Sequence, residues 1–230
     1  MKNYVSWCMD SCRWDMFHLA DAPYMKEFTN MRMVYSRAAI TPPSLFASFM
    51  NLSWYESNGA VLIPEIKRWV WVPSELQKLG YHTVFVTSNP MLELYKTFFS
   101  IGFNEYIMLK GCTYHADNMV NMAIDRVKSH QNTFIFLLFM ETHQPYPNKP
   151  NHTQEYLNKN YRPITRQKKS IETIDKEFAR LTSELWGTNT DILIFSDHGD
   201  LDLKMEGHQG HGPAKFHDKL FEIPYGRKTI

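Results

Sequence analysis

The sequence has few cysteines and no long hydrophobic run. Three cysteines occur in 230 residues, at positions 8, 12 and 112, and no Cys-x-x-Cys pair followed by a second such pair indicates a zinc site. An odd number of cysteines without that pattern is typical of reduced thiols in a cytosolic protein. No stretch approaches the ~18 consecutive apolar residues of a membrane-spanning helix, and no signal peptide is recognisable. We therefore expect a soluble, cytoplasmic protein with no membrane partner.

An excess of either charge is also lacking. Lys and Arg number 25 and Asp and Glu number 24, so electrostatics give no reason to expect nucleic acid or an anionic membrane as a partner. Hydrophobic residues make up 43% of the chain and aromatic residues 14%, which is enough for a full core. The length suits one α/β domain, and no internal repeat divides it. We predict a single domain over residues 1–230. The oligomeric state stays open, a homo-oligomer included.

Short apolar runs alternate along the chain with helical patterns, the order typical of a sheet with helices on both faces. We predict strands over residues 4–9, 32–36, 82–87, 133–140 and 191–196, and helices over residues 24–30, 42–50, 74–79, 117–130 and 165–185. The continuous apolar run at 133–140 indicates a buried central strand. Residues 199–230 show little periodicity. The fold class is therefore α/β, with a central, mostly parallel sheet.

Side chains of metal-ligating types follow three of the apolar runs. Asp10 ends the first, Glu141 and His143 follow the run at 133–140, and Asp197 and His198 follow the last. Ligands of open α/β sheets bind beyond the carboxyl ends of the strands. Carboxylates and imidazoles delivered there, with a hydroxyl, suit a divalent ion such as Zn²⁺, Mn²⁺, Mg²⁺ or Ca²⁺.

Each of these residues also has a structural interpretation. Asp10 after a strand can serve as a helix cap, and Thr41 and Ser44 can cap the helix that Pro42 helps to open. Asp197-His198-Gly199 can be a simple turn. Trp54, Trp69 and Trp71 belong either to the core or to a loop that covers the site. No single residue decides between these alternatives.

Seven short motifs, in order between residues 4 and 225, resemble those of the sulfatase/alkaline-phosphatase superfamily. They are Asp10-Ser11-Cys12-Arg13-Trp14-Asp15, Thr41-Pro42-Pro43-Ser44, Leu79-Gly80-Tyr81-His82-Thr83 with Thr87-Ser88-Asn89-Pro90, Gly102-Phe103, His143-Gln144-Pro145-Tyr146, Ser196-Asp197-His198-Gly199-Asp200, and Gly210-His211-Gly212 with Phe221-Glu222-Ile223-Pro224. One such match is weak evidence, whereas seven in family order are strong. The resemblance implies the alkaline-phosphatase-like α/β fold.

The resemblance also implies a metal-dependent hydrolase or transferase. Its metal site is implied to consist of Asp10, Thr41, Asp197 and His198. Sulfatases of this family convert a Cys or Ser to a formylglycine hydrate, but the extra methyl on the Cβ of Thr41 prevents formation of that aldehyde. A threonine hydroxyl can itself act as the nucleophile when a metal lowers its pKa. We therefore expect Thr41 to attack a phosphate ester, phosphodiester or phosphonate in line.

His143 and His211 are implied to bind the substrate oxyanion or to protonate the leaving group. One metal ion is the principal prediction. The alternative is a second ion, because His208, His211 and His217 lie close together in the sequence. Glu141 is expected to make a structural contact rather than a metal bond.

Several positions depart from the family pattern. Ser11 replaces the second Asp of many true sulfatases, Leu45 replaces the Arg of their signature, and Glu222 replaces an Arg before Val-Pro. Arg13 and Asp15 are expected to form a structural pair beneath the site. Because family members usually continue further, we expect the C-terminal subdomain to be truncated or absent.

Two alternatives to a phosphoester enzyme remain at this point. The first is an enzyme of the same fold that hydrolyses sulfate esters without formylglycine, so the expected partner is a small phosphorylated or sulfated molecule. The second is a catalytically silent sulfatase-like binding or scaffold protein. A silent protein has no need of six ligand-type residues at motif positions, and this sequence has Asp10, Thr41, His143, Asp197, His198 and His211 there.

Overall fold

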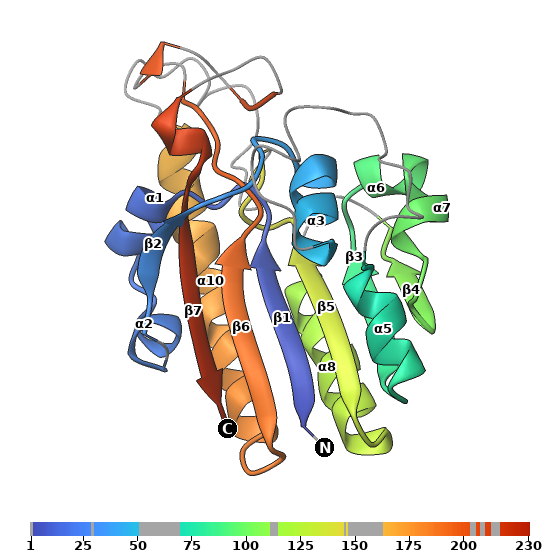
Figure 1. The fold of residues 1–230 in the computed structure, drawn as a ribbon. Coiled ribbons are helices and arrows are strands. Elements are labelled where there is room, and N and C mark those ends of the chain that lie inside the picture. Colours follow the sequence, from blue (N-terminus) through green and yellow to red (C-terminus); the bar gives the residue numbers. More distant parts are fainter. Residues whose placement is uncertain are drawn as a thin grey trace.

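The structure is a computed structural model that describes residues 2–28, 30–50, 70–110, 115–144, 146, 163–202, 206–207, 210–212 and 217–230. Within these residues the strands form one seven-stranded sheet in the order β2-β7-β6-β1-β5-β3-β4 (Figure 1). The strands are β1 (Asn3–Met9), β2 (Arg32–Tyr35), β3 (His82–Thr87), β4 (Glu105–Met108), β5 (Thr133–Phe139), β6 (Thr190–Ser196) and β7 (Glu222–Thr229).

Strand direction is mostly parallel, as predicted. β1 runs parallel to both of its neighbours, β5 and β6, and β3 runs parallel to β4 and β5. β7 is antiparallel to β6 on one side and to β2 on the other. The carboxyl ends of β1, β3, β5 and β6 therefore meet at one edge of the sheet, where the segments that follow them can share a site.

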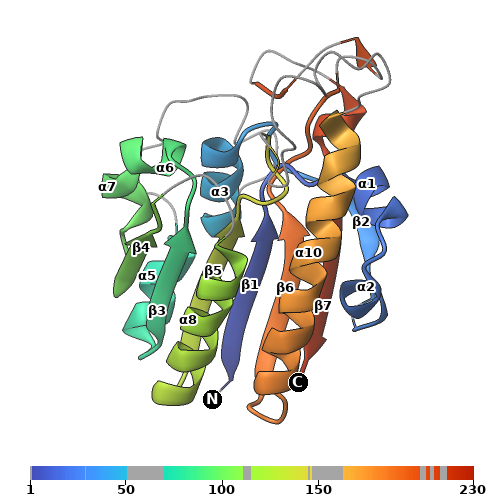
Figure 2. The ribbon, with the colours of Figure 1, turned by 180° about the vertical axis from the view of Figure 1, so that it is seen from behind.

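Helices cover both faces of the sheet. α8 (Ala116–Ser129) and α10 (Pro163–Glu184) lie behind it in Figure 1 and in front of it in Figure 2. α1 (Trp14–Leu19) and α2 (Pro23–Phe28) pack against α10. The opposite face carries α3 (Thr41–Phe49), α5 (Val72–Lys78), α6 (Met91–Leu94) and α7 (Lys96–Phe99), and a short 3-10 helix, η2 (Asp218–Leu220), precedes β7. None of the described helices combines the length and apolarity needed to cross a membrane.

The sheet is buried on both faces along its central strands. Ile135, Leu137 and Phe139 of β5 belong to the core beneath α8 and α10, whereas the alternate residues Phe134 and Phe136 belong to the core beneath α3. Because successive side chains of a strand point to opposite faces, a strand covered on both sides must be apolar throughout. This explains the continuous apolar run that predicted a central strand.

The predicted strands and helices are present, with ends shifted by a few residues, but the sequence did not predict α1, α6, α7, β4 or β7. Residues 199–230 show little periodicity in the sequence, yet β7 forms there. Pro224 and Gly226 lie inside β7, and both residue types disfavour strands. Hydrogen bonds to β6 and β2 hold this strand despite its composition.

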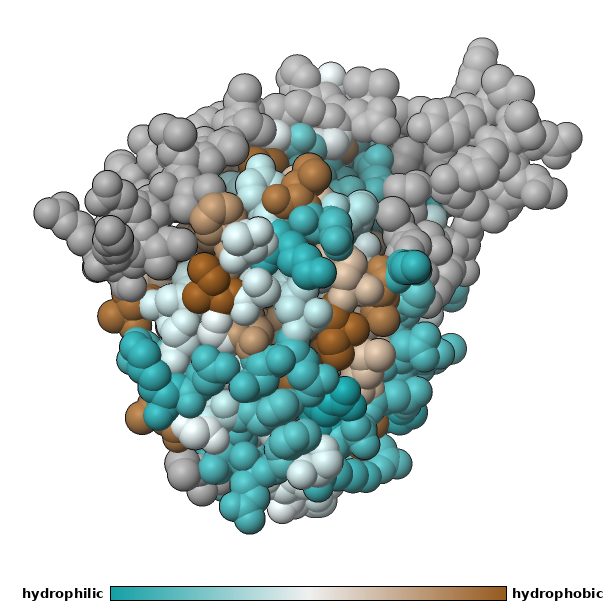
Figure 3. All heavy atoms as spheres, turned by 90° about the vertical axis from the view of Figure 1, so that its right-hand side faces the viewer, coloured by the Kyte–Doolittle hydropathy of each residue, from teal (hydrophilic) through white to brown (hydrophobic). Residues whose placement is uncertain are grey.

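The side of the molecule that carries α5, α6 and α7 is shown in Figure 3. Hydrophobic atoms occur there in separate groups between hydrophilic ones. The strongly exposed apolar side chains of this part of the chain are Val70, Leu79, Met91, Leu94 and Ile101. Scattered apolar side chains of this kind are normal on protein surfaces.

Candidate functional site

Asp10 lies directly beyond β1, and several partners hold its carboxylate. Asn89, which follows β3, donates from Nδ2 to Asp10 Oδ2 (2.7 Å), and the Ser11 hydroxyl donates to Asp10 Oδ1 (2.9 Å). Thr142, which follows β5, donates from Oγ1 to the carbonyl of Asp10 (2.7 Å). Asp10 is fully buried. Segments after three neighbouring strands therefore fix one carboxylate at the edge of the sheet.

Ser11 links Asp10 to the end of β6. Its φ of 61° lies in the left-handed region, which is uncommon for a residue other than glycine. This conformation directs the Ser11 N–H to Asp197 Oδ1 (3.0 Å). Backbone strain of this kind is characteristic of functional sites, where the surrounding contacts maintain it. This hydrogen bond links the segment that carries Asp10 to the segment that carries Asp197.

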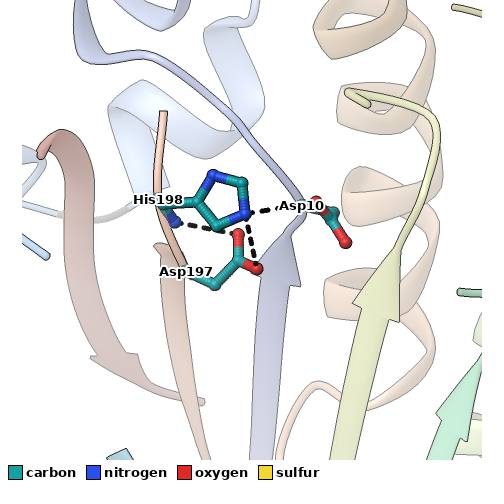
Figure 4. Close-up of side chains that lie close together, drawn as sticks. All are labelled: Asp10, Asp197 and His198. Carbon is teal, nitrogen blue, oxygen red and sulfur yellow. Dashed lines mark hydrogen bonds and ion pairs between the residues drawn. The ribbon is translucent and has the colours of Figure 1, made fainter. Parts of the chain in front are cut away.

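Asp197 and His198 follow β6 and are both buried (Figure 4). The Nδ1 atom of His198 lies 2.7 Å from the carbonyl oxygen of Gly199. A carbonyl only accepts hydrogen bonds, so Nδ1 carries the proton and Nε2 presents a lone pair. That Nε2 atom lies 3.5 Å from Asp197 Oδ2 and 3.9 Å from Asp10 Oδ1. The imidazole is thus oriented as a metal-binding histidine is, with its other nitrogen donating to the protein.

Gly199 allows this turn to lie against the chain that precedes β7. A Cβ atom at position 199 would lie 1.9 Å from the carbonyl oxygen of Lys219. The Gly199 N–H also donates to the carbonyl of Leu220 (2.8 Å). The motif therefore requires glycine after Asp197 and His198 because two backbone segments meet there.

Thr41 is the first residue of α3, and its hydroxyl points into the same cluster. Its Oγ1 atom lies 3.2 Å from His198 Nε2 and 3.3 Å from Asp10 Oδ2. The interpretation of Thr41 and Ser44 as helix caps is wrong: the N-cap residue is Ile40, and the Ser44 hydroxyl donates to the carbonyl of Asp197 (2.6 Å). Prolines in the first turn of α3 open the helix and leave the Thr41 side chain available.

One group of side chains in the described part of the chain could hold a metal ion: Asp10, Asp197 and His198. Their ligand atoms all lie within 4.8 Å of one another. Asp197 Oδ2 is a buried oxygen for which the described residues provide no hydrogen bond. A buried acceptor of this kind is costly unless a partner satisfies it. The donor set and the unsatisfied oxygen therefore fit a divalent cation.

The electrostatics of the cluster support the same conclusion. Burial raises the pKa of Asp197, and the neighbouring Asp10 carboxylate raises it further. Burial acts on Asp10 in the same direction, but His143, His198 and His211 outweigh it and hold the pKa of Asp10 below its ordinary value. Burial also lowers the pKa of His198, which favours the neutral imidazole. Two buried carboxylates side by side repel each other, and a bound cation would relieve that repulsion.

The structure brings His143 and His211 to this cluster. The His211 ring centroid lies 4.4 Å from that of His198 and 5.1 Å from that of His143. His211 Nδ1 lies 3.3 Å from Oδ1 of the buried Asp200, which orients the ring. Three imidazoles from distant parts of the chain therefore border the Asp10 carboxylate.

The expected structural contacts around the site are confirmed. Arg13 is fully buried and pairs with Asp15 (2.7 Å) and with Glu206 (3.0 Å). Glu141 Oε1 accepts hydrogen bonds from the N–H groups of His115 and Ala116, at 2.9 and 2.8 Å, and so caps α8. Both side chains hold segments together and do not reach the metal-ligand group.

Some residues of the site were not predicted. Gln167 of α10 is fully buried and donates from Nε2 to the carbonyls of Ser11 and Thr142, each at 2.8 Å. Asn89 belongs to a segment that resembles the family pattern, but the sequence assigns it no role. Nothing in the sequence distinguishes Gln167 from a solvent-facing residue of an amphipathic helix. Asn89 follows a predicted strand as Asp10 does, and that position was an available signal.

The structure also places a tryptophan, a histidine and two cysteines whose roles the sequence left open. Trp71 belongs to the core, where its Nε1 donates to the carbonyl of Ile101 (2.6 Å). His217 is the N-cap of η2 and accepts from the Lys219 N–H, so it offers no support for a second metal ion. Cys8 and Cys12 are buried free thiols, and burial raises their pKa values. The described residues do not include Trp54, Trp69, Cys112 or His208.

Solved structures of similar fold include three of known name. The C-terminal periplasmic domain of phosphoethanolamine transferase EptC from Campylobacter jejuni is 15% identical, with a TM-score of 0.73 over 99% of this chain and 79% of that one. The corresponding domain of EcEptC from Escherichia coli is 16% identical, with a TM-score of 0.71 over 99% and 72%, and it is also known in complex with Zn. Phosphoglycerol transferase GacH from Streptococcus pyogenes, in complex with sn-glycerol-1-phosphate, is 13% identical, with a TM-score of 0.68 over 99% and 68%.

At these identities the structural likeness establishes the fold and leaves the activity open. No curated protein matches the chain by sequence. A family model described as sulfatase does match, and it spans residues 2–225. That span includes every residue of the cluster around Asp10, Thr41, Asp197 and His198. The chain therefore belongs to the sulfatase family.

Proposed function

We propose that this chain is a metal-dependent enzyme that transfers or hydrolyses a phosphate-containing group, with Thr41 as the nucleophile. The observation that carries the proposal is the position of the Thr41 hydroxyl between Asp10 Oδ2 and His198 Nε2, beside Asp197. A hydroxyl that contacts two acceptors in a buried cluster is polarised toward loss of its proton. A helix cap or a core threonine has no need of such neighbours.

Four side chains would hold the metal ion: Asp10, Thr41, Asp197 and His198. A bound divalent cation would lower the pKa of the Thr41 hydroxyl and offset charge that develops on the transferred group. The lone pair of His198 Nε2 and the unsatisfied Asp197 Oδ2 both face the place where such an ion would bind. One ion is proposed, because the described residues provide one such group.

The protein residues then have defined roles. The Thr41 hydroxyl passes its proton to a water molecule, and Oγ1 forms a bond to phosphorus as the bond to the leaving oxygen breaks in line with it. His143 or His211 donates a proton to that leaving oxygen, since both rings border the cluster. A water molecule or an acceptor alcohol then takes the phosphoryl group from Thr41. Asp200 keeps the His211 ring oriented during these steps.

Phosphorus is favoured over sulfur for a chemical reason. Threonine cannot form the formylglycine aldehyde on which sulfatases depend, whereas its hydroxyl is a competent nucleophile toward phosphorus. Two of the similar structures are named as transferases of phosphoethanolamine and phosphoglycerol. These names support an alcohol acceptor as well as water. The predicted cytoplasmic location stays a prediction, and the EptC structures are periplasmic domains by name.

The test combines metal analysis with trapping of the nucleophile. Wild type, Thr41→Ala, Thr41→Ser and Asp197→Ala are analysed for bound metal and assayed with an aryl phosphate, a phosphodiester and the matched aryl sulfate. We expect stoichiometric metal in wild type, its loss in Asp197→Ala, and phosphoester turnover that Thr41→Ala abolishes and Thr41→Ser retains. Acid quenching and peptide mass analysis should place a phosphoryl group on residue 41.

Two outcomes would contradict the proposal. Absence of bound metal in wild type at saturating Zn²⁺, Mn²⁺ and Ca²⁺ would remove the metal site and favour a silent binding protein. Turnover of the sulfate ester in preference to the phosphate ester would make the chain a sulfate-ester hydrolase without formylglycine.

A further inference from the structure

Gln167 lies at the start of α10, where that helix reaches the candidate site. α10 ends at Glu184, shortly before β6 begins, so its first turns lie at the edge of the sheet where β1, β5 and β6 end (Figure 2). Ile171, Ile174 and Phe178 bury the helix against the core, and α1, α2 and α8 pack against it. A side chain on the first turns of α10 is therefore attached to a firmly packed part of the molecule.

The side-chain amide of Gln167 is fully buried, and hydrogen bonds occupy both of its ends. Its Nε2 atom donates to the carbonyl oxygens of Ser11 and Thr142, each at 2.8 Å, and its Oε1 atom accepts from the N–H of Arg13 (3.0 Å). An amide nitrogen has two N–H donors, so both are used here. Lys or Arg at this position would bury a charge, and Glu would direct a second acceptor at the two carbonyls. A neutral side chain with two donors and an acceptor matches this place.

These hydrogen bonds hold two peptide groups beside the site. The peptide that follows Ser11 has its carbonyl bonded to Gln167 and its N–H bonded to Ser196 Oγ (2.9 Å). The peptide that follows Thr142 has its carbonyl bonded to Gln167 and its N–H bonded to the carbonyl of Met140 (3.0 Å). Since each peptide is bonded at both its C=O and its N–H, neither can rotate without losing a buried hydrogen bond, which is costly.

Ser11 connects the first of these peptides to two predicted metal ligands. Its N–H donates to Asp197 Oδ1 (3.0 Å), and its hydroxyl donates to Asp10 Oδ1 (2.9 Å). The left-handed φ of 61° at Ser11 persists only where contacts on both sides hold it, and Gln167 supplies a contact on the carbonyl side. Without that contact Ser11 would relax to an ordinary conformation and withdraw its donors from the two carboxylates. Gln167 therefore acts on Asp10 and Asp197 through Ser11.

Thr142 connects the second peptide to the same carboxylate segment. Its hydroxyl donates to the carbonyl of Asp10 (2.7 Å), and its own carbonyl accepts from Gln167. The residue after Thr142 is His143, whose ring lies beside that of His211 at the border of the site. One amide on α10 therefore fixes both the turn that carries Asp10 after β1 and the turn that carries His143 after β5.

We propose that Gln167 is a positioning residue of this site: its amide holds the turns at Ser11 and Thr142 in the geometry that metal binding requires. The inference rests on the proposed function, because it concerns the same metal site. Side chains that orient metal ligands in this way change metal affinity or activity by roughly 10–100-fold when they are replaced. α10 thereby contributes to the reaction, although none of its described residues belongs to the metal-ligand group.

The test measures metal affinity, by competition between the protein and a fluorescent chelator for Zn²⁺ and for Mn²⁺. Gln167→Met keeps the length of the side chain and removes both donors and the acceptor. Gln167→Asn keeps the amide but is one methylene shorter, so its nitrogen falls short of the two carbonyls. Asp175→Ala is the matched control, because Asp175 is also buried on α10 and accepts from two backbone N–H groups of α2, which lies outside the site. Urea unfolding confirms that each variant is folded.

We expect Gln167→Met to raise the metal Kd about tenfold or more and Gln167→Asn to raise it as well. Asp175→Ala should lower the free energy of unfolding and leave the metal Kd unchanged, so a general loss of stability is separated from a loss of positioning. At saturating metal, kcat toward the phosphoester should fall in Gln167→Met by a larger factor than KM rises, because the substrate contacts remain.

An unchanged metal Kd in folded Gln167→Met would overturn this inference and leave the proposed function standing. Absence of bound metal in wild type would overturn both. Where Gln167→Met fails to fold, Gln167→Asn decides, and an unchanged Kd there overturns the inference. A metal Kd raised equally in Asp175→Ala would also overturn it, because the effect would then follow from lost stability.

Discussion

Asp197→Asn should stabilise the metal-free protein and weaken its response to metal. Burial and the Asp10 carboxylate raise the pKa of Asp197 to about 8. Above that pH and without a cation, Asp10 and Asp197 are two buried carboxylates whose ligand atoms lie within 4.8 Å of each other. Coulomb's law at that separation and an effective dielectric constant of about 20 gives a repulsion of about 3 kcal/mol. Asparagine removes the charge, and its Oδ1 can still accept from the N–H groups of Ser11 and His198.

The net gain should be smaller than the full repulsion, because the new amide Nδ2 must find an acceptor. We expect the free energy of unfolding in EDTA to rise by roughly 1–3 kcal/mol, with Tm rising roughly 2–4 °C for each kcal/mol. Metal at a hundredfold excess over Kd should stabilise wild type by about 2.7 kcal/mol and the variant by much less. The variant should therefore be the more stable protein in EDTA, and added metal should make wild type as stable as the variant or more stable.

The measurement is denaturant unfolding at about pH 9, above the raised pKa of Asp197, with EDTA and with saturating Zn²⁺ or Mn²⁺. Asp191→Asn is the matched control, since Asp191 lies at the other end of β6 and is also buried. Its carboxylate accepts from Lys2 (3.0 Å), from Arg227 and from the Thr229 hydroxyl. Neutralising it should destabilise the protein equally with and without metal. If Asp197→Asn is the less stable protein in EDTA, the repulsion argument is wrong; if it responds to metal as wild type does, the ligand assignment is wrong.

Three further results are expected. Burial alone would raise the pKa of Asp191, but its hydrogen-bonded and cationic partners lower it to about 2, from an ordinary value of 3.8. The stabilising effect of the ionised Asp191 is therefore present above pH 3.8 and lost as the pH falls toward 2. The free energies of unfolding of wild type and Asp191→Asn should converge in that pH window. Gly199→Ala should lower the free energy of unfolding by roughly 2–4 kcal/mol, because the new Cβ would clash with the Lys219 carbonyl oxygen. An unchanged Tm would show that this turn can shift. Glu141→Ala should lower the free energy of unfolding by roughly 1–2 kcal/mol, because α8 loses its cap, and Glu141→Gln should lower it less, because it keeps an acceptor oxygen. Equal losses for the two variants in urea unfolding would contradict the capping role.

The order of elements and most of the central sheet could be predicted because burial on both faces leaves a strong pattern. β5 is apolar throughout and α8 and α10 are amphipathic, so local sequence identified them. β7 could not be predicted, because its place between β6 and β2 depends on hydrogen bonds to strands distant in the sequence. Pro224 opposes that outcome locally, and only the pairing overrides it.

The sequence by itself determined which side chains end the strands, and hence that Asp10, Asp197 and His198 would meet. Parallel strands bring their carboxyl ends to one edge, so the position of a residue after its strand already placed it. The structure decided how these groups face one another. The lone pair of His198, the left-handed turn at Ser11 and the hydrogen bonds of Gln167 all depend on contacts between segments far apart in the chain. No local pattern records such contacts, because a single segment does not contain both partners.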